Sequence, residues 1–151
     1  MAPIVEKDFI ERMIKQFAEA LARALGLARK GKVHEAIEQL EAACPSLLGM
    51  DYAPLALVDS ASAAALLREP AKVKTFAKLL AGAAEVYELA GEPGLARSKW
   101  QHALEVFLEA SRLRPDDAEA AEQIRLLAAK VPLDLLPEKY RAQVQDRGVR
   151  G

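Results

Sequence analysis

The sequence predicts an all-α protein, and three observations support this fold class. Of 151 residues, 30 are alanine and 22 are leucine, whereas threonine occurs once and asparagine is absent. Alanine and leucine are strong helix formers, and the β-branched residues that favour strands are scarce. Apolar residues recur every three or four positions, and no segment alternates apolar and polar residues with the period of a strand.

Spacing and punctuation predict about six to seven helices. A stripe from Phe9 to Leu25 marks the first helix, which Gly31 ends. Pro45 ends the second helix, and the stretch 47–58 is expected to be a loop with at most one helical turn. The predicted helices cover residues 8–30, 32–44, 60–68, 70–90, 93–114, a segment that starts at Asp116 or Asp117 and contains Ile124, Leu127 and Ala128, and 138–144.

Capping residues support the boundaries in the second half of the chain. Asp59 or Ser60 is a suitable N-cap for the short helix that follows. Pro70 and Pro93 fit the first turn of a helix, where a missing amide hydrogen has no cost. Pro115 stops the long helix before it.

Length and charge limit the classes of protein. A chain of 151 residues fits one domain, expected over 1–146, with a frayed tail at 147–151. The 21 basic and 22 acidic side chains give a net charge of −1, without the basic excess that a nucleic-acid partner requires. No apolar run reaches the roughly 20 residues of a membrane span or forms a signal peptide. We therefore expect a cytoplasmic protein with no nucleic-acid partner and no membrane span.

Two segments, 27–43 and 87–103, form an internal near-repeat. In each, a bulky apolar residue is followed by glycine four positions later, alanine five positions after that, and then a large apolar residue and another alanine. Glycine permits a tight turn, and small alanines let two helix axes approach closely. The near-repeat predicts two antiparallel helical hairpins.

This pattern resembles the tetratricopeptide (TPR) unit, whose signature has small, aromatic, glycine, alanine, aromatic and alanine positions in this order. The matching residues are Ala84, Tyr87, Gly91, Ala96, Trp100 and Ala103 in the second unit and Ala24, Leu27, Gly31, Ala36, Leu40 and Ala43 in the first. The two glycines are 60 residues apart, whereas a direct tandem repeats at about 34, so about 26 residues are inserted. Leu108 replaces the usual closing proline. The resemblance therefore implies TPR-like hairpins in a compact bundle.

A more particular resemblance covers roughly residues 8–110. The opening segment 8–16, the turn at 47–51 and the later hairpin are similar to a small bacterial family of short TPR-like proteins. That family has no assigned activity or catalytic residues, so this resemblance bears on the fold alone.

The TPR resemblance also implies a peptide groove on the inner face of the first helix of each unit. TPR domains that clamp a carboxyl-terminal peptide place Lys, Asn and Arg there, whereas this chain has Ala81, Glu85 and Leu89. An acidic tail is therefore disfavoured, and a segment with basic and apolar residues fits best. The candidate groove residues are Leu21, Leu25, Arg29, Lys78, Glu85, Glu88 and Leu89.

No motif predicts a cofactor or a metal. The segment from Gly91 to Gly94 lacks the Gly-Lys-Ser/Thr ending of a phosphate loop and follows no strand. His34 and His102 lack the glutamate three residues earlier that a di-iron bundle requires. Cys44, the single cysteine, excludes a disulfide within the chain and is expected to be a buried apolar residue.

The remaining candidates have simpler structural explanations. The acidic pairs Glu35/Glu38, Glu85/Glu88 and Asp116/Asp117 fit exposed helix faces and caps better than acid–base catalysis. Tyr87 and Trp100 are expected in the seam between helices rather than at a ligand platform. The stripe at Phe9, Ile10, Met13 and Phe17 fits a helix that faces the core or a second copy better than a membrane-surface helix.

These observations lead to three hypotheses of function. The first is a non-catalytic module that binds another protein, with no enzymatic activity. The second is a structural protein that forms a homodimer through an apolar face of the first helix or of the 61–67 helix. The third is an enzyme or small-ligand binder whose polar groups come from distant helices.

Overall fold

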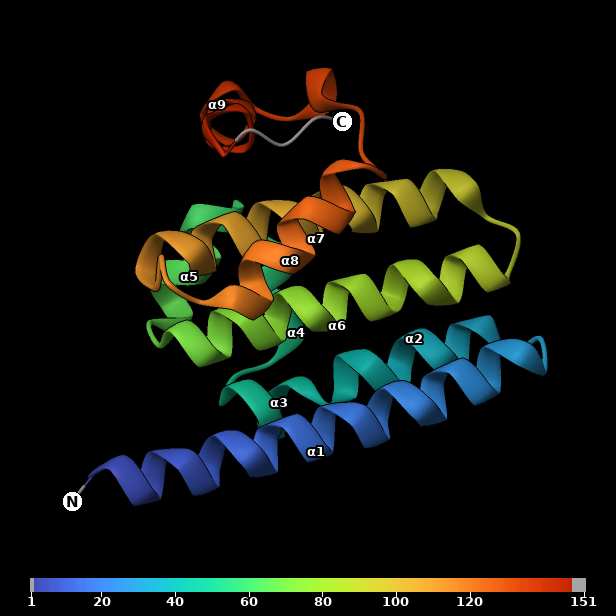
Figure 1. The fold of residues 1–151 in the computed structure, drawn as a ribbon. Helices are drawn as coiled ribbons and strands as arrows, with labels where there is room; N and C mark the ends of the chain where they lie inside the picture. The colour runs from blue at the N-terminus through green and yellow to red at the C-terminus, as the bar shows by residue number, and fades with distance from the viewer. Residues whose placement is uncertain (1, 148–151) are drawn as a thin grey trace.

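The computed structural model describes residues 2–147 and the side chains of residues 7–147. All secondary structure in this part of the chain is helical, which confirms the all-α prediction (Figure 1). The helices are α1 (Ala2–Arg29), α2 (Val33–Ala42), α3 (Cys44–Leu48), α4 (Tyr52–Ala56), α5 (Ser60–Leu67), α6 (Pro70–Leu89), α7 (Pro93–Leu113), α8 (Ala118–Ala128), the 3₁₀ helix η1 (Leu133–Leu135) and α9 (Glu138–Asp146).

Over the described residues, the helices outnumber the six to seven expected, because the stretch 47–58 is mostly helical. The one helical turn expected there is α4, and the second short helix, α3, was not expected. Pro45 and Pro54 lie in the first turns of α3 and α4, where proline removes no intrahelical hydrogen bond. Gly49 ends α3 with φ of 79°, a left-handed conformation that separates the two short helices. Helix α1 also starts six residues earlier than expected, since Pro3 fits its first turn.

The caps of the later helices are as predicted. The Asp59 side chain accepts a hydrogen bond from the Ser62 amide (2.8 Å) at the start of α5. Of the two candidates before α8, Asp117 is the cap, and it accepts from the Ala120 amide (3.1 Å).

The predicted hairpins form at α1–α2 and α6–α7, and their turns are built alike. Gly31 and Gly91 have φ of 79° and 74°. The amide of Lys32 donates to the Leu27 carbonyl, and that of Glu92 donates to the Tyr87 carbonyl, both at 2.9 Å. These hydrogen bonds are those of a Schellman motif, in which a left-handed residue lets the chain turn back tightly.

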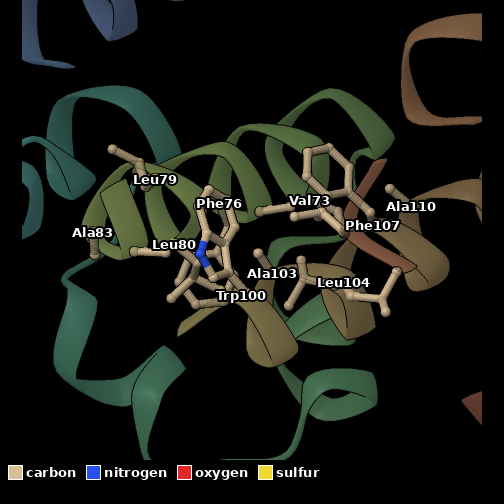
Figure 2. Close-up of a cluster of buried hydrophobic side chains, with 14 of the residues drawn as sticks. Val73, Phe76, Leu79, Leu80, Ala83, Trp100, Ala103, Leu104, Phe107 and Ala110 are labelled. Atoms are coloured by element: carbon tan, nitrogen blue, oxygen red, sulfur yellow. The ribbon is translucent and has the colours of Figure 1, made fainter. Parts of the chain in front are cut away.

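Helix α6 is the central element of the bundle, and it packs against α7 on one side and against α1 and α2 on the other (Figure 1). The alanines of the near-repeat sit at these contacts: Ala36, Ala84 and Ala103 are fully buried. Figure 2 shows the core between α6 and α7, where Phe76 and Phe107 are also fully buried. Small residues therefore bring the helices together, and large ones fill the space between them.

The C-terminal segment packs on α7. Leu136, Tyr140 and Val144 are buried, and the Tyr140 hydroxyl donates to the Glu109 carboxylate at 2.6 Å. Of the tail expected at 147–151, the structure describes only Arg147, which donates to the Ser111 hydroxyl; residues 148–151 lie outside the described part. Among the described helices, none is both long and apolar enough to cross a membrane.

Candidate functional site

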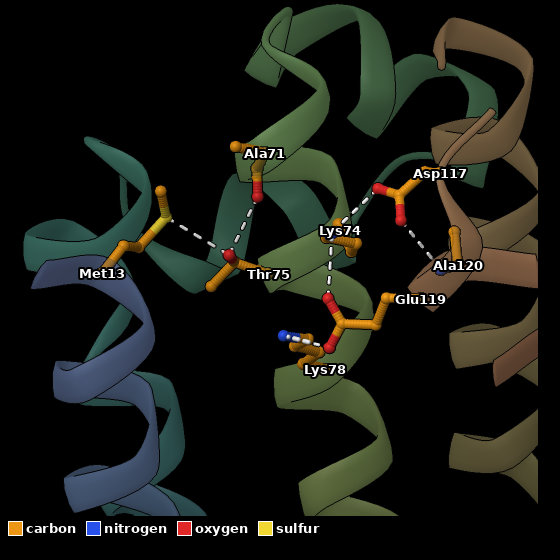
Figure 3. A network of polar contacts seen from close by, with 8 residues as sticks. All are labelled: Met13, Ala71, Lys74, Thr75, Lys78, Asp117, Glu119 and Ala120. Atoms are coloured by element: carbon orange, nitrogen blue, oxygen red, sulfur yellow. Dashed lines mark hydrogen bonds and ion pairs between the residues drawn. The ribbon is translucent and has the colours of Figure 1, made fainter. Parts of the chain in front are cut away.

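Helix α1 runs in the same direction as α6. Near the start of α6, the sulfur of Met13 lies 3.2 Å from the Thr75 hydroxyl, which itself donates to a backbone carbonyl (Figure 3). Further along, a Cβ added to Gly82 would lie 3.0 Å from Cδ1 of Leu21. Residue numbers therefore increase in the same direction along the two helices, so α1 and α6 are parallel.

Helix α8 lies on the other side of α6 and is parallel to it as well. Lys74 Nζ lies 2.8 Å from Asp117 and 2.9 Å from Glu119, and Lys78 Nζ lies 2.7 Å from Glu119 (Figure 3). Long lysine side chains thus join the beginnings of α6 and α8. We call the surface formed by the parallel helices α1, α6 and α8 the inner face.

The ion pairs between α6 and α8 shift the pKa values of Lys74, Asp117 and Glu119 toward their charged forms. Burial alone would lower the pKa of Lys74, but its contacts with Asp117 and Glu119 outweigh this effect and raise it. Burial would likewise raise the pKa of both carboxyl groups, but their hydrogen bonds to Lys74 and, for Glu119, to Lys78 lower it. These shifts favour the charged forms of Lys74, Asp117 and Glu119, and both lysines already have counter-ions.

At its N-terminal end the inner face contains a hollow of about 120 Å³ between α1 and α6, which we call the wedge. Ile10 and Ile14 are 39% and 52% exposed on its α1 side, whereas Met13 is buried. The wedge is lined by Ile10, Met13, Ile14, Pro70, Ala71, Lys74, Thr75, Lys78, Arg114, Asp117 and Glu119.

The α1 wall of the wedge is the N-terminal part of the apolar stripe of that helix. Phe9 and Ile10 continue the stripe that is buried further along α1, and they are 38% and 39% exposed. The N-terminal part of α1 extends past the bundle in Figure 1. The first part of the stripe therefore has apolar side chains exposed to solvent.

The α1 residues predicted to line the groove are only partly available there. Leu21 and Leu25 are partly buried and pack against the core. Arg29 is exposed at the last turn of α1. The α1 side of the inner face is therefore more open at its N-terminal end than at these positions.

Some of the α6 residues predicted for the groove already contact other side chains of the protein, and others do not. Lys78 is bound to Glu119. Glu88 accepts a hydrogen bond from Nε1 of Trp100 at 2.8 Å. Leu89, by contrast, is 51% exposed. The structural contacts of Lys78 and Glu88 make them poor sites for testing the groove by mutation.

Glu85 is the free acidic group of this set. It is partly buried, and within the described part of the chain its carboxylate makes no hydrogen bond or ion pair. Burial raises its pKa, the neighbouring Glu88 raises it further, and Lys130 lowers it. A carboxylate in this setting is stabilised by a cation that approaches from outside.

The other residues considered for chemistry, Cys44 and His102, lie in surroundings that fit a structural role. Cys44 is fully buried, and burial followed by the charges of Glu41 and Asp51 raises its thiol pKa to about 12. A thiol with this pKa is not a nucleophile at neutral pH. His102 packs edge-on against Phe76, with ring centroids 5.8 Å apart.

No cluster of three or more His, Cys, Asp or Glu side chains suited to a metal ion occurs in residues 7–147. Exposed His34 pairs with Glu38 at 3.4 Å, and His102 lies beside Lys99, which helps burial to lower its pKa to about 4. The two histidines therefore lie in different environments.

The inserted segment between the two hairpins lies away from the wedge. None of residues 44–67 lines it. Tyr52 instead packs against Phe76, with centroids 6.4 Å apart, and Ser60 donates to Glu105 of α7 at 2.8 Å. Phe76 and Lys78 point in widely different directions, because successive residues of a helix are rotated by about 100°. The insertion therefore leaves the wedge uncovered.

Sequence reasoning missed the wedge and the contribution of α8. The spacing of Ile10, Met13 and Ile14 marked an apolar face, but no local pattern shows that the fold buries Met13 and leaves Ile10 and Ile14 partly exposed. The sequence gives no sign of the contacts of Glu119, because only the fold places it against Lys74 and Lys78.

Comparison of the chain with family models, with curated proteins and with solved structures finds no match.

Proposed function

We propose that this chain is a non-catalytic, TPR-like module that holds a segment of another protein on its inner face. Two antiparallel hairpins and the helix α8 that follows them bring α1, α6 and α8 side by side in the same direction, and this arrangement supports the proposal. Parallel helices of this kind make a long shallow surface with side chains from each helix, suited to a polypeptide segment.

Glu85 is the observation that carries the proposal. Its carboxylate is partly buried, next to Glu88, and makes no ion pair in the described residues. A lysine or arginine from a partner would supply the missing counter-charge, and Leu89, 51% exposed one turn further on, would contact the apolar part of that side chain. The partner segment is therefore basic and apolar, as the sequence implied.

The cations of the inner face argue against an acidic partner. Lys74 and Lys78 are bound to Asp117 and Glu119 at 2.7 to 2.9 Å. An acidic segment would have to break these ion pairs and would also meet the negative charges of Glu85 and Glu88. Charge complementarity of this kind controls which partners bind and how fast they associate.

Site-specific photo-crosslinking in the cells that produce the protein tests this proposal. A photoreactive amino acid replaces Leu89 on the inner face or, as the matched control, Leu113 of α7, which is 47% exposed. We expect a defined protein to be captured from position 89 and not from position 113. Glu85→Lys should abolish the capture.

Glu88 is left unchanged in this experiment because it holds Trp100. Circular dichroism of Glu85→Lys confirms that the variant is folded. The same proteins captured from positions 89 and 113, or capture that Glu85→Lys leaves unchanged, would exclude the inner face as the binding surface.

A further inference from the structure

We infer that the wedge is an anchor pocket for one aliphatic side chain of the partner segment, and that the same segment places a basic residue about 21 Å away at Glu85. This inference rests on the proposed function and specifies the chemistry of the partner. It assigns a role to Ile10 and Ile14, which the proposed function alone does not use.

The α1 wall of the wedge selects an apolar side chain. Ile10 and Ile14 are 39% and 52% exposed, and Met13 forms the buried floor between them. Ala71 and Pro70 face them from α6. The volume of about 120 Å³ is enough for one side chain and too small for a folded element, and burial of an aliphatic group here removes apolar surface of both molecules from water.

The opposite wall excludes a basic side chain from the wedge. Lys74 and Lys78 line it together with Arg114, and the carboxylates of Asp117 and Glu119 are already bound to the two lysines. A lysine or arginine entering here would meet three cations and no free anion in this wall. The basic residue of the partner is therefore confined to the Glu85 end, which fixes the direction of the segment along the inner face.

The length of α6 sets the distance between the two contacts. Ala71 at the wedge and Glu85 are fourteen residues apart on this helix, which is about 21 Å at 1.5 Å per residue. An extended segment covers this distance in about six or seven residues, and a helical segment covers it in about fourteen.

Selection of a random 16-residue peptide library displayed on phage tests the inference. The library is selected on the full chain and on Ile14→Glu, Glu85→Gln and the control Leu113→Glu. On the wild-type chain we expect peptides that carry an aliphatic and a basic residue at one of these two spacings. Ile14→Glu should weaken these peptides at least tenfold and remove the aliphatic preference, Glu85→Gln should remove the basic preference, and Leu113→Glu should change neither.

The outcomes separate the inference from the function on which it rests. If the wild-type chain selects no peptide family, both fail. Selected peptides that bind Ile14→Glu as tightly as the wild-type chain would overturn the anchor pocket and leave the binding function intact. Light scattering at two concentrations adds a check on the occupant, because a dimer that Ile14→Glu dissociates would assign the wedge to a second copy of the chain and overturn the inference.

Discussion

Nε1 of Trp100 donates a hydrogen bond to the Glu88 carboxylate at 2.8 Å, which links α7 to the end of α6. Lys130 lies over the indole ring, and its Nζ is 4.8 Å from the ring centroid. The ring is only 7% exposed. A single side chain thus connects both helices of the second hairpin with the segment that follows α8.

Trp100→Ala should therefore lower the free energy of unfolding by about 3 to 5 kcal/mol, the usual loss for a large aromatic residue in a core. Trp100→Phe loses the hydrogen bond but keeps part of the packing. It should therefore lower the free energy of unfolding less than Trp100→Ala does. Urea unfolding followed by circular dichroism measures both. An unchanged midpoint for Trp100→Ala would mean that the indole does not stabilise the hairpin.

Gly82→Ala should stabilise the protein less than Gly26→Ala does. In a helix interior, alanine gives a free energy of unfolding roughly 0.5 to 1 kcal/mol higher than glycine does. A Cβ added at Gly26 would meet no atom within 4 Å. At Gly82 the new Cβ would lie 3.0 Å from Leu21 Cδ1, so part or all of this gain is lost. Thermal melts of the two variants measure the difference, and equal gains would contradict the close contact of α1 with α6.

His102 should make the protein less stable as the pH falls. Burial and the nearby Lys99 lower its pKa from 6.5 to about 4 in the folded chain. Between these pH values the unfolded chain binds a proton that the folded chain does not, so stability decreases as the pH falls from 6.5 to about 4, by on the order of 2 to 3 kcal/mol. Urea unfolding at a series of pH values measures the slope.

His102→Phe should remove this part of the pH dependence, because phenylalanine does not titrate. His34→Gln is the matched control, since His34 is exposed, and its profile should follow that of the wild type. A His102→Phe profile as steep as that of the wild type would show that other groups cause the acid sensitivity.

Asp117→Ala should lower the free energy of unfolding by about 1 to 2 kcal/mol, because it removes both the N-cap of α8 and a partner of Lys74. Asp116→Ala is the control, since this neighbouring residue is exposed and is not the cap. The pKa of Asp117 is lowered in the folded state. Its contribution should therefore be present above the ordinary aspartate pKa and be lost as the pH falls through the lowered value. A loss that is the same for both variants would contradict this role.

The hairpins could be predicted because their signals are local. The left-handed conformations of Gly31 and Gly91 follow from glycine at the end of an apolar stripe. The caps at Asp59 and Asp117 are likewise contained in a few consecutive residues. In the stretch 47–58 the sequence allowed one helical turn, which is α4, but not the short helix α3, since proline also occurs in the first turn of a helix.

The candidate site could be predicted only in part. The TPR resemblance implied Glu85 and Leu89 as groove residues, and their role in binding stays a prediction. Ile10 belonged to an apolar stripe whose neighbours could not be known, because its exposure depends on how α6, sixty residues later in the chain, packs against α1. The ion pairs of Glu119 join residues more than forty positions apart, and no local pattern contains such a contact.

The inserted helices on the far side of α6 have a practical consequence. Leu57, between α4 and α5, is 85% exposed, and the insertion does not line the wedge. A fluorescent dye attached at position 57 would therefore report on tumbling and complex formation without blocking the surface on which a partner is expected to dock. The same loop offers a place to graft an affinity tag or to vary the chain length while α1, α6 and α8 stay as they are.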